Sequence, residues 1–469
     1  MFARFGFSNY RGVAGSESLS LIAAEPRNKA GPALIEGIGG EYLVTGSAEQ
    51  SCLPFTILLG LDHRESIVRA MKSLRLQVAH SGGTSAKDAT IVDNLFTRKI
   101  PDPGRPTVLE CDVVIGRTLY SYGFRYDADQ YVSEWLWRET GRGRETLFTR
   151  DGQDVEYEAE IASEVQDHQP LIGPRRLLLA QAQVKPGLLR TIHWAIRNMH
   201  EIVGDADVER MQRQVATQMD RRLIPFLQLF DPTIEDFKKV GSSDRADGQS
   251  PTTVIQIARR SSEGSTTATA YRDEPEQLRR WMLVLTWAFA IIDIGGTLVV
   301  HEVEAELGSQ LACHLLGLFS DWRINWKAAQ LIATTSKLGM VNSGIVRPDQ
   351  INILSRQPDG SLKIRCLPEI GPAPEGPDQS SKCSTSPGSG DLGSLAARLR
   401  TKQVEWEPPH FHMEVVGRTR AGKKYWTLRK RWDLFLEMVR WRNDHLHLPR
   451  ETRSRAMREA FARRGAIFR

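Results

Sequence analysis

Residues 60–66, with the sequence GLDHRES, lie between an apolar run and a stretch of helical periodicity, and their side chains could contact a phosphate group. The amides at a helix N-terminus favour anions, and Arg64 adds a positive charge. Asp62 and Glu65 oppose an anion, because two like charges about 4 Å apart repel by roughly 1 kcal/mol in water. The alternative is an ordinary N-capped helix with acidic residues near its positive end.

His301 and Glu302 directly follow an apolar stretch at residues 297–300. A carboxylate at the end of a buried strand can act as a base toward a water molecule. A neutral imidazole is a poor ligand for Mg²⁺, which prefers oxygen. Glu302 is therefore the candidate catalytic residue, although it would lack a metal beside it. The alternative is a solvated residue after a buried strand.

The C-terminal region carries the basic charge of the chain. Residues 395–469 contain 19 Lys+Arg and 8 Asp+Glu, a net charge of +11 in a chain whose total is +5. Basic residues interleaved with tryptophan suit phosphate neutralisation and base stacking, which favours contact with nucleic acid. The alternative is an amphipathic helix that packs on the rest of the protein. The candidate nucleic-acid contacts are Lys423, Lys424, Arg429, Lys430 and Arg431.

The spacing of histidine and cysteine predicts no metal site. The two histidine pairs, at residues 410 and 412 and at 445 and 447, could supply four imidazoles to zinc, but nothing fixes one pair against the other. We expect scattered histidines instead. The 5 cysteines form no CxxC pair and leave an odd number, which indicates a reducing, cytoplasmic compartment.

The composition is that of a globular chain. It has 469 residues, 41% hydrophobic and 25% charged, and roughly 100–200 residues per domain suggest two to four units. No signal peptide is recognised at the N-terminus. Residues 281–300 are almost wholly apolar, but Asp293 and the pair Gly295-Gly296 interrupt them. We expect a buried helix, a turn and a buried strand there, and no membrane partner.

Local patterns predict alternating strands and helices. The opening segment, residues 2–11, is expected to be an edge strand, and residues 175–240 are expected to be helical. The pair Asp151-Gly152 predicts a hairpin turn inside a strand-rich region at 106–157. The other expected strands are 55–59, 253–258, 267–271, 297–300 and 330–334 with a last pair turning at 358–360, and the other expected helices are 66–79 and 307–320.

Five groups of stretches, in the same order, resemble one family: prokaryotic AAA-type ATPases with an ABC-like head, which are related to SMC and DNA-repair ATPase heads and often belong to phage defence. The resemblance covers about residues 1–365. It implies an α/β fold, an ABC-type P-loop NTPase-like head with a mixed sheet, an antiparallel β-arm and a helical insertion, and it implies ATP and Mg²⁺ as cofactors. The stretches are FSNYRG at 7–12 with LSLIAAE at 19–25, YSYGF at 120–124 with EWL at 134–136 and RDG at 150–152, GGTLVVHE at 295–302, AQLIATTS at 329–336, and RPDQI at 347–351.

The phosphate-binding loop of this family departs from its pattern. That pattern is GxxxxGK followed by Ser or Thr, and it corresponds here to residues 60–66. Gly60 and Ser66 match, but the loop is one residue short, the second Gly is missing and Glu65 stands in place of Lys. The resemblance leaves Gly60, Arg64 and Ser66 as the nucleotide contacts.

Three further family positions have changed. In the Walker B strand at residues 297–302, His301 replaces the acid of the Mg²⁺ shell, while Glu302 keeps the second acid. Ser336 replaces the histidine that senses the γ-phosphate, and Pro275 occupies the position of the signature serine. Because four losses at one site are not easily repaired by a neighbour, we expect an ATPase fold whose hydrolysis is weak or absent.

The resemblance also divides the chain. The predicted parts are the N-terminal part of the head at 1–90, a β-arm at 91–165, a helical insertion at 166–250, the C-terminal part of the head at 251–366, a linker at 367–394 and a basic appendage at 395–469.

The first functional hypothesis is an ATPase-family protein with weak nucleotide binding and impaired hydrolysis, acting in a defence or DNA-transaction complex. Its partners would be a second head, identical or different, or an effector protein. The alternatives are a pseudo-ATPase that scaffolds a partner protein, and a nucleic-acid-binding protein that acts through residues 395–469.

Overall fold

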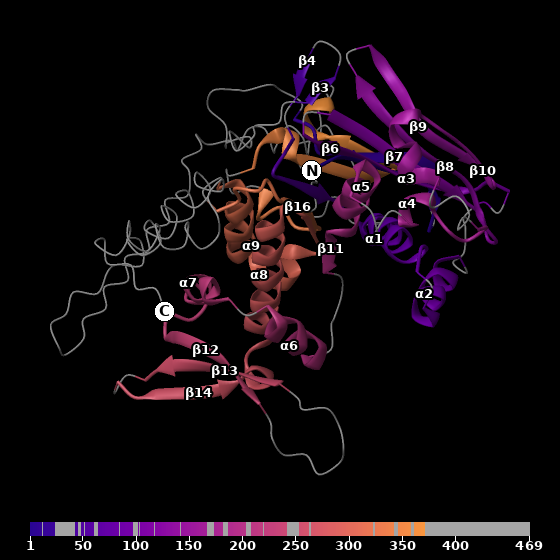
Figure 1. Cartoon of the computed structure of the whole chain (residues 1–469). Coiled ribbons are helices and arrows are strands. Elements are labelled where there is room, and N and C mark those ends of the chain that lie inside the picture. Colours follow the sequence, from indigo (N-terminus) through magenta and orange to yellow (C-terminus); the bar gives the residue numbers. More distant parts are fainter. Residues whose placement is uncertain are drawn as a thin grey trace, which may run out of the picture. The chain divides into compact units, whose positions relative to one another are not determined.

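The structure is a computed structural model, drawn in Figure 1. The chain separates into two units, Met1–Trp406 and Glu407–Arg469, and every described residue belongs to the first. The basic appendage with its five candidate nucleic-acid contacts and both histidine pairs lie outside the described residues, so those hypotheses stay predictions. The described residues are 1–370 except 12, 24–42, 46–47, 51, 61–63, 84, 97–101, 103, 117, 141, 167–172, 182–185, 203–207, 219, 242–252, 262–263, 322–323, 342–345 and 358–360.

One sheet is mainly parallel. Its six strands have the order β11-β15-β16-β5-β17-β18; β11 to β17 run parallel and β18 pairs antiparallel with β17. Strands β5, β15 and β16 are buried along their whole length, as is typical of parallel strands covered on both faces. The bounds are Phe55–Leu59 (β5), Met199–Ile202 (β11), Thr297–Val300 (β15), Gln330–Thr335 (β16), Ile351–Arg356 (β17) and Leu362–Cys366 (β18).

The second sheet is antiparallel and has seven strands in the order β10-β9-β8-β7-β6-β1-β2. The hairpin expected at Asp151-Gly152 joins β9 to β10, and Gly152 has φ +57°, a left-handed value that suits glycine. The bounds are Phe2–Tyr10 (β1), Val13–Ser20 (β2), Thr107–Ile115 (β6), Thr118–Tyr126 (β7), Tyr131–Thr140 (β8), Gly143–Asp151 (β9) and Asp154–Tyr157 (β10).

The expectation that the opening segment is an edge strand is wrong. Strand β1 lies between β2 and β6, and Phe5 pairs with Leu19 on one side and with Cys111 on the other. The partner strand β6 comes about a hundred residues later, so no local pattern reveals it. The alternating aromatic residues of β1 instead face a large core.

Helices connect and cover the sheets. α9 (Val303–Ser320) links β15 to its neighbour β16, and α8 (Glu276–Ile294) packs against β15 and β11. α1 (Arg64–His80) follows β5 and contacts β11 of the parallel sheet and β1 and β6 of the antiparallel sheet, so it lies between the two. The first residue of α1 is thereby held at the end of β5.

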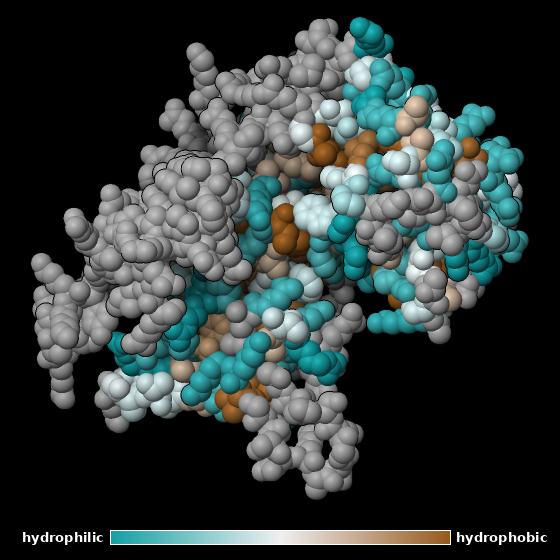
Figure 2. All heavy atoms as spheres, in the orientation of Figure 1, coloured by the Kyte–Doolittle hydropathy of each residue, from teal (hydrophilic) through white to brown (hydrophobic). Residues whose placement is uncertain are grey.

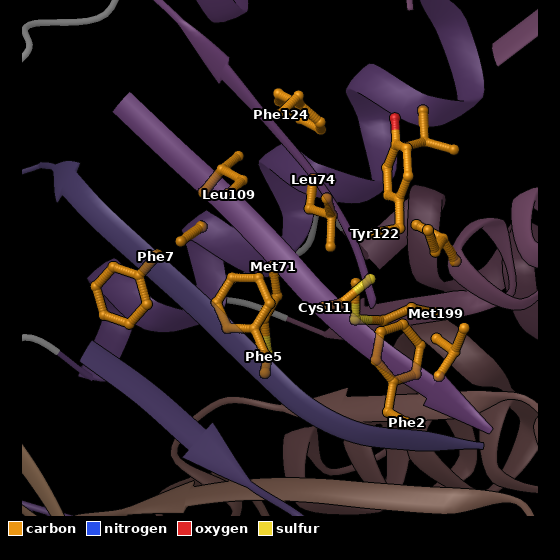
Figure 3. Packing of buried hydrophobic residues seen from close by; sticks show 14 of the residues in the cluster. Phe2, Phe5, Phe7, Met71, Leu74, Leu109, Cys111, Tyr122, Phe124 and Met199 are labelled. Carbon is orange, nitrogen blue, oxygen red and sulfur yellow. The ribbon is translucent and has the colours of Figure 1, made fainter. Parts of the chain in front are cut away.

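The core between the sheets contains side chains from the antiparallel sheet, from α1 and from the parallel sheet (Figure 3). Aromatic residues of the antiparallel sheet face α1, and β11 of the parallel sheet adds a methionine. This packing fixes α1 relative to both sheets. The labelled residues are Phe2, Phe5, Phe7, Leu109, Cys111, Tyr122 and Phe124 of the antiparallel sheet, Met71 and Leu74 of α1, and Met199 of β11.

Two smaller sheets, β12-β13-β14 and the pair β3-β4, complete the described part, and α6 packs against β13. The prediction that residues 175–240 are helical is partly wrong, because β11 and β12 lie within that range. Strand β11 has only four residues, too few to show a period. The bounds are Ile234–Gly241 (β12), Thr253–Arg260 (β13), Thr266–Ala270 (β14), Leu43–Thr45 (β3), Ala48–Gln50 (β4), Ala86–Phe96 (α2), Ala162–Gln166 (α3), Leu178–Gln181 (α4), Leu188–Arg197 (α5), Val208–Thr217 (α6) and Ile224–Leu227 (α7).

The apolar stretch at residues 281–300 forms a helix, a turn and a strand, as expected. Helix α8 ends at Gly295, where φ is +76° and a Cβ would lie 2.7 Å from the Lys327 carbonyl oxygen, so both the conformation and the space require glycine. No helix among the described residues is long and apolar enough to cross a membrane. On the face shown in Figure 2, hydrophilic residues cover most of the described surface and the apolar ones form small, separate patches.

Gln330, at the start of β16, joins the two large sheets. Its Oε1 accepts a hydrogen bond from the Phe2 amide at 2.5 Å, and its Nε2 donates to the carbonyl oxygens of Phe2 at 2.9 Å and Leu53 at 3.1 Å. The side chain is fully buried. One amide group therefore satisfies backbone groups that come before β5 and at the start of β1.

Replacing Gln330 with leucine is expected to lower the free energy of unfolding by about 2 kcal/mol, because buried backbone groups lose their partners. Equilibrium denaturation measures the change. The control is Gln357→Leu; at this partly buried position the Gln357 side chain donates to the Ser355 hydroxyl at 3.1 Å, its one hydrogen bond to the described residues. Equal effects of the two substitutions would contradict the bridging role.

Candidate functional site

The candidate residues from three distant stretches meet at one edge of the parallel sheet. Strands β5, β15 and β16 run parallel, so Gly60, Glu302 and Ser336 follow their strands at the same carboxyl edge. Arg64 begins α1 at this edge. Open α/β proteins bind their ligands at the carboxyl edge of the sheet. These side chains lie at that edge.

The centre of the group is an ion pair between Arg64 and Glu302. The Arg64 Nε donates to Glu302 Oε1 at 2.8 Å, and Nη2 donates to the same oxygen. The Ser336 hydroxyl donates to Glu302 Oε2 at 3.1 Å. The Arg64 side chain is 9% exposed and that of Glu302 is 22% exposed. Both carboxylate oxygens therefore have a partner within the protein.

The backbone of Glu302 is held in an unusual conformation. Its φ is +52° and its ψ is 45°, the left-handed region that residues with a Cβ rarely adopt. The Glu302 amide donates to Thr334 Oγ1 at 3.0 Å, and that oxygen lies 2.9 Å from His301 Nδ1. Thr334, buried in β16, thus anchors the Glu302 backbone in this conformation.

His301 is neutral in this setting. Burial lowers its pKa, and the nearby Glu302 carboxylate opposes this only in part. The Thr334 hydroxyl oxygen accepts from the Glu302 amide, and it forms a hydrogen bond with Nδ1 of the neutral imidazole, whose direction depends on the tautomer. His301 serves as a structural partner of the threonine.

Glu65 and Ser66 have partners away from Glu302. Glu65 is half exposed and pairs with Arg69 one helical turn later. The Ser66 hydroxyl donates to the Arg11 carbonyl oxygen at 3.3 Å, which links α1 to the turn after β1. The sequence placed both Arg64 and Glu65 in the phosphate-binding loop, and of the two the structure brings Arg64 to Glu302.

Gly60 and Pro275 both have structural roles. A Cβ at Gly60 would lie 2.8 Å from the Leu354 Cβ and 3.0 Å from its carbonyl oxygen, so the close approach of β17 requires glycine. The Pro275 carbonyl accepts from the Arg279 amide at 3.1 Å, as at the start of a regular helix.

The described residues around Glu302 do not fit a magnesium-bound triphosphate; Asp62, in the preceding loop, lies outside the described residues. Among the described residues, no group of three or more His, Cys, Asp or Glu side chains could hold a metal ion. Of the groups beside Glu302, His301 offers nitrogen and the Thr334 hydroxyl is already bonded. Glu302 itself is paired with a permanent cation, Arg64. No step through the metal follows from this arrangement.

Two buried residues near the edge were missed from the sequence. Besides Thr334, Glu304 is 1% exposed and accepts from the Met340 amide at 2.8 Å and from the Thr335 hydroxyl at 2.9 Å. It thereby fixes the loop that follows β16 and carries Ser336. The signal in the sequence was the pair of threonines that ends an otherwise apolar strand.

The fold and the site define an α/β protein with a charged cluster at the carboxyl edge of a mainly parallel sheet. No protein-family model matches the chain, and no curated protein matches its sequence. Among solved structures, it is similar to an Smc head bound to the C-winged helix domain of ScpA, with 12% identity, a TM-score of 0.39, and coverage of 78% of this chain and 96% of that one.

Two other solved structures give comparable values. The SMC head domain of Thermotoga maritima has 9% identity and a TM-score of 0.35, covering 78% of this chain and 98% of that one. An Smc head domain with an extended coiled coil, bound to the C-terminal domain of ScpA derived from Pyrococcus furiosus, has 10% identity and a TM-score of 0.29, covering 78% and 95%. At these scores the comparisons carry no functional argument, which rests on the geometry of the site.

Proposed function

We propose that this chain is an ABC-type ATPase-head-like protein whose ATP hydrolysis is weak or absent, and that it acts in a complex as a partner-binding subunit. The observation that supports this most is the engagement of both Glu302 carboxylate oxygens by Arg64 and Ser336. A general base must accept a hydrogen bond and then a proton from water, and here both carboxylate oxygens already accept hydrogen bonds from the protein.

Two of the nucleotide contacts proposed from the sequence already form hydrogen bonds within the protein. Arg64 directs two of its nitrogens to Glu302, and the Ser66 hydroxyl is bonded to the Arg11 carbonyl. Nucleotide binding through Gly60, Arg64 and Ser66 would have to break one or both of these contacts, so we propose that it is weak. The partner is a second head or an effector protein, in a defence or DNA-transaction complex.

Turnover by the full chain tests the proposal. With ATP and Mg²⁺ supplied, phosphate release is expected to stay at the level of a protein-free control. The variant Glu302→Gln, which keeps the side-chain shape but cannot act as a base, is expected to give the same level. Release by the unmodified protein that disappears in Glu302→Gln would overturn the proposal, because Glu302 would then be a working base.

A further inference from the structure

We propose that the Arg64 guanidinium is the resident cation of this site and takes the role that a divalent metal ion has in a nucleotide-hydrolysing site. This inference deepens the proposed function and rests on it for the comparison with hydrolysing sites. It follows from the disagreement between the residues present and a magnesium site.

The positive charge of Arg64 is buried beside the Glu302 carboxylate. Arg64 is the first residue of α1, and its side chain is 9% exposed, which is rare for arginine. Two of its three nitrogens contact Glu302. An arginine side chain is always protonated in proteins, so the positive charge beside this carboxylate is permanent.

The described charges near Glu302 form pairs. A second described ion pair nearby joins Glu65 to Arg69 on the surface of α1, so these two charges neutralise each other. His301 is neutral because burial lowers its pKa. Among the described residues, Glu302 and Arg64 therefore neutralise each other, so the pair has no net negative charge with which to attract a divalent cation.

The Arg64 side chain also connects elements of the fold. The Arg64 side chain ties the start of α1 to the end of β15, and Ser336 extends the tie to the segment after β16. The third nitrogen, Nη1, is buried and has no hydrogen-bond partner among the described residues, so the guanidinium is enclosed rather than solvated. The elements that a metal-bound nucleotide would hold together are thus held by the chain itself.

Thermal unfolding of the full chain tests the inference. The variant Arg64→Ala is expected to lower the Tm by about 3 °C, because a largely buried carboxylate loses its counterion. Methylguanidinium, a small cation of the missing type, is expected to restore much of this loss, and MgCl₂ is not. The matched control is Arg69→Ala, which removes an exposed guanidinium from the same helix and should change the Tm little and gain nothing from methylguanidinium.

A second arm needs no variant. The Tm of the unmodified protein is expected to be the same in MgCl₂ and in EDTA, with or without ATP. A rise in Tm with Mg²⁺, a Tm of Arg64→Ala equal to that of the unmodified protein, or equal rescue of both alanine variants would each overturn the inference. Stabilisation by Mg²⁺ without turnover would contradict this inference alone, whereas phosphate release that persists in EDTA would contradict the proposed function alone.

Discussion

Replacing Glu134 with alanine is expected to lower the free energy of unfolding by about 3–5 kcal/mol, because it leaves a buried arginine without its counterion. Glu134 and Arg150 are both 0% exposed, with Oε2 and Nη1 3.5 Å apart. The carboxylate also accepts from the Leu178 and Leu179 amides at 2.7 and 3.0 Å and from the Tyr122 hydroxyl at 2.9 Å. It therefore joins the antiparallel sheet to the start of α4.

The measurement is equilibrium denaturation of Glu134→Ala beside a matched surface variant. Glu145→Ala removes a carboxylate that is 45% exposed and pairs with Arg138 across the same sheet. That change should cost less than about 1 kcal/mol, as exposed ion pairs do. A loss of similar size in both variants would show that the burial of Glu134 contributes nothing.

His193 is expected to make the protein less stable as the pH falls from 6.5 toward 4. Burial is the main cause that lowers its pKa from 6.5 to about 4, and the charge of Arg197 adds to the shift. The unfolded chain therefore takes up the proton first, so the contribution is complete above pH 6.5 and is lost on acidification. At about 1.4 kcal/mol per pKa unit, the loss approaches 3 kcal/mol near pH 4.

The check compares the unmodified protein with His193→Leu across this pH range. His193 is 3% exposed, and its Nε2 has no hydrogen-bond partner among the described residues. Leucine is of similar size and does not titrate, although it loses the hydrogen bond between the ring and the Val78 backbone. Because other titrating groups are common to both proteins, the difference in unfolding free energy isolates His193. A difference that stays constant from pH 6.5 to 4 would contradict the assignment.

Local patterns predicted the elements whose signals are local. The hairpin at Asp151-Gly152, the turn at Gly295 and the buried strand Thr297–Val300 each depend on residues within a few positions of one another. The structure contains all three. Strand Phe2–Tyr10 was placed at an edge because its second partner, β6, is far along the chain.

The candidate site was predicted in part for the same reason. Glu302 and Ser336 were singled out, and the structure brings them together at 3.1 Å. The contact between Arg64 and Glu302 spans 238 positions, and which residue of the loop would reach the carboxylate depends on the exact start of α1. Thr334 was missed because the pair of threonines that ends β16 is a weak signal, with no spacing that identifies a particular partner.

The torsion angles of Glu302 bear on what that position is for. Glycine would adopt φ +52° without penalty and asparagine with little, whereas glutamate pays on the order of 1 kcal/mol there. If no acid were needed at position 302, glycine or asparagine would give a less strained backbone there. Exchanging Glu302 for glycine should thus relieve the local backbone strain and remove the carboxylate that, among the described residues, pairs with Arg64. The side chain, and not the turn of the backbone, therefore explains a glutamate at this position.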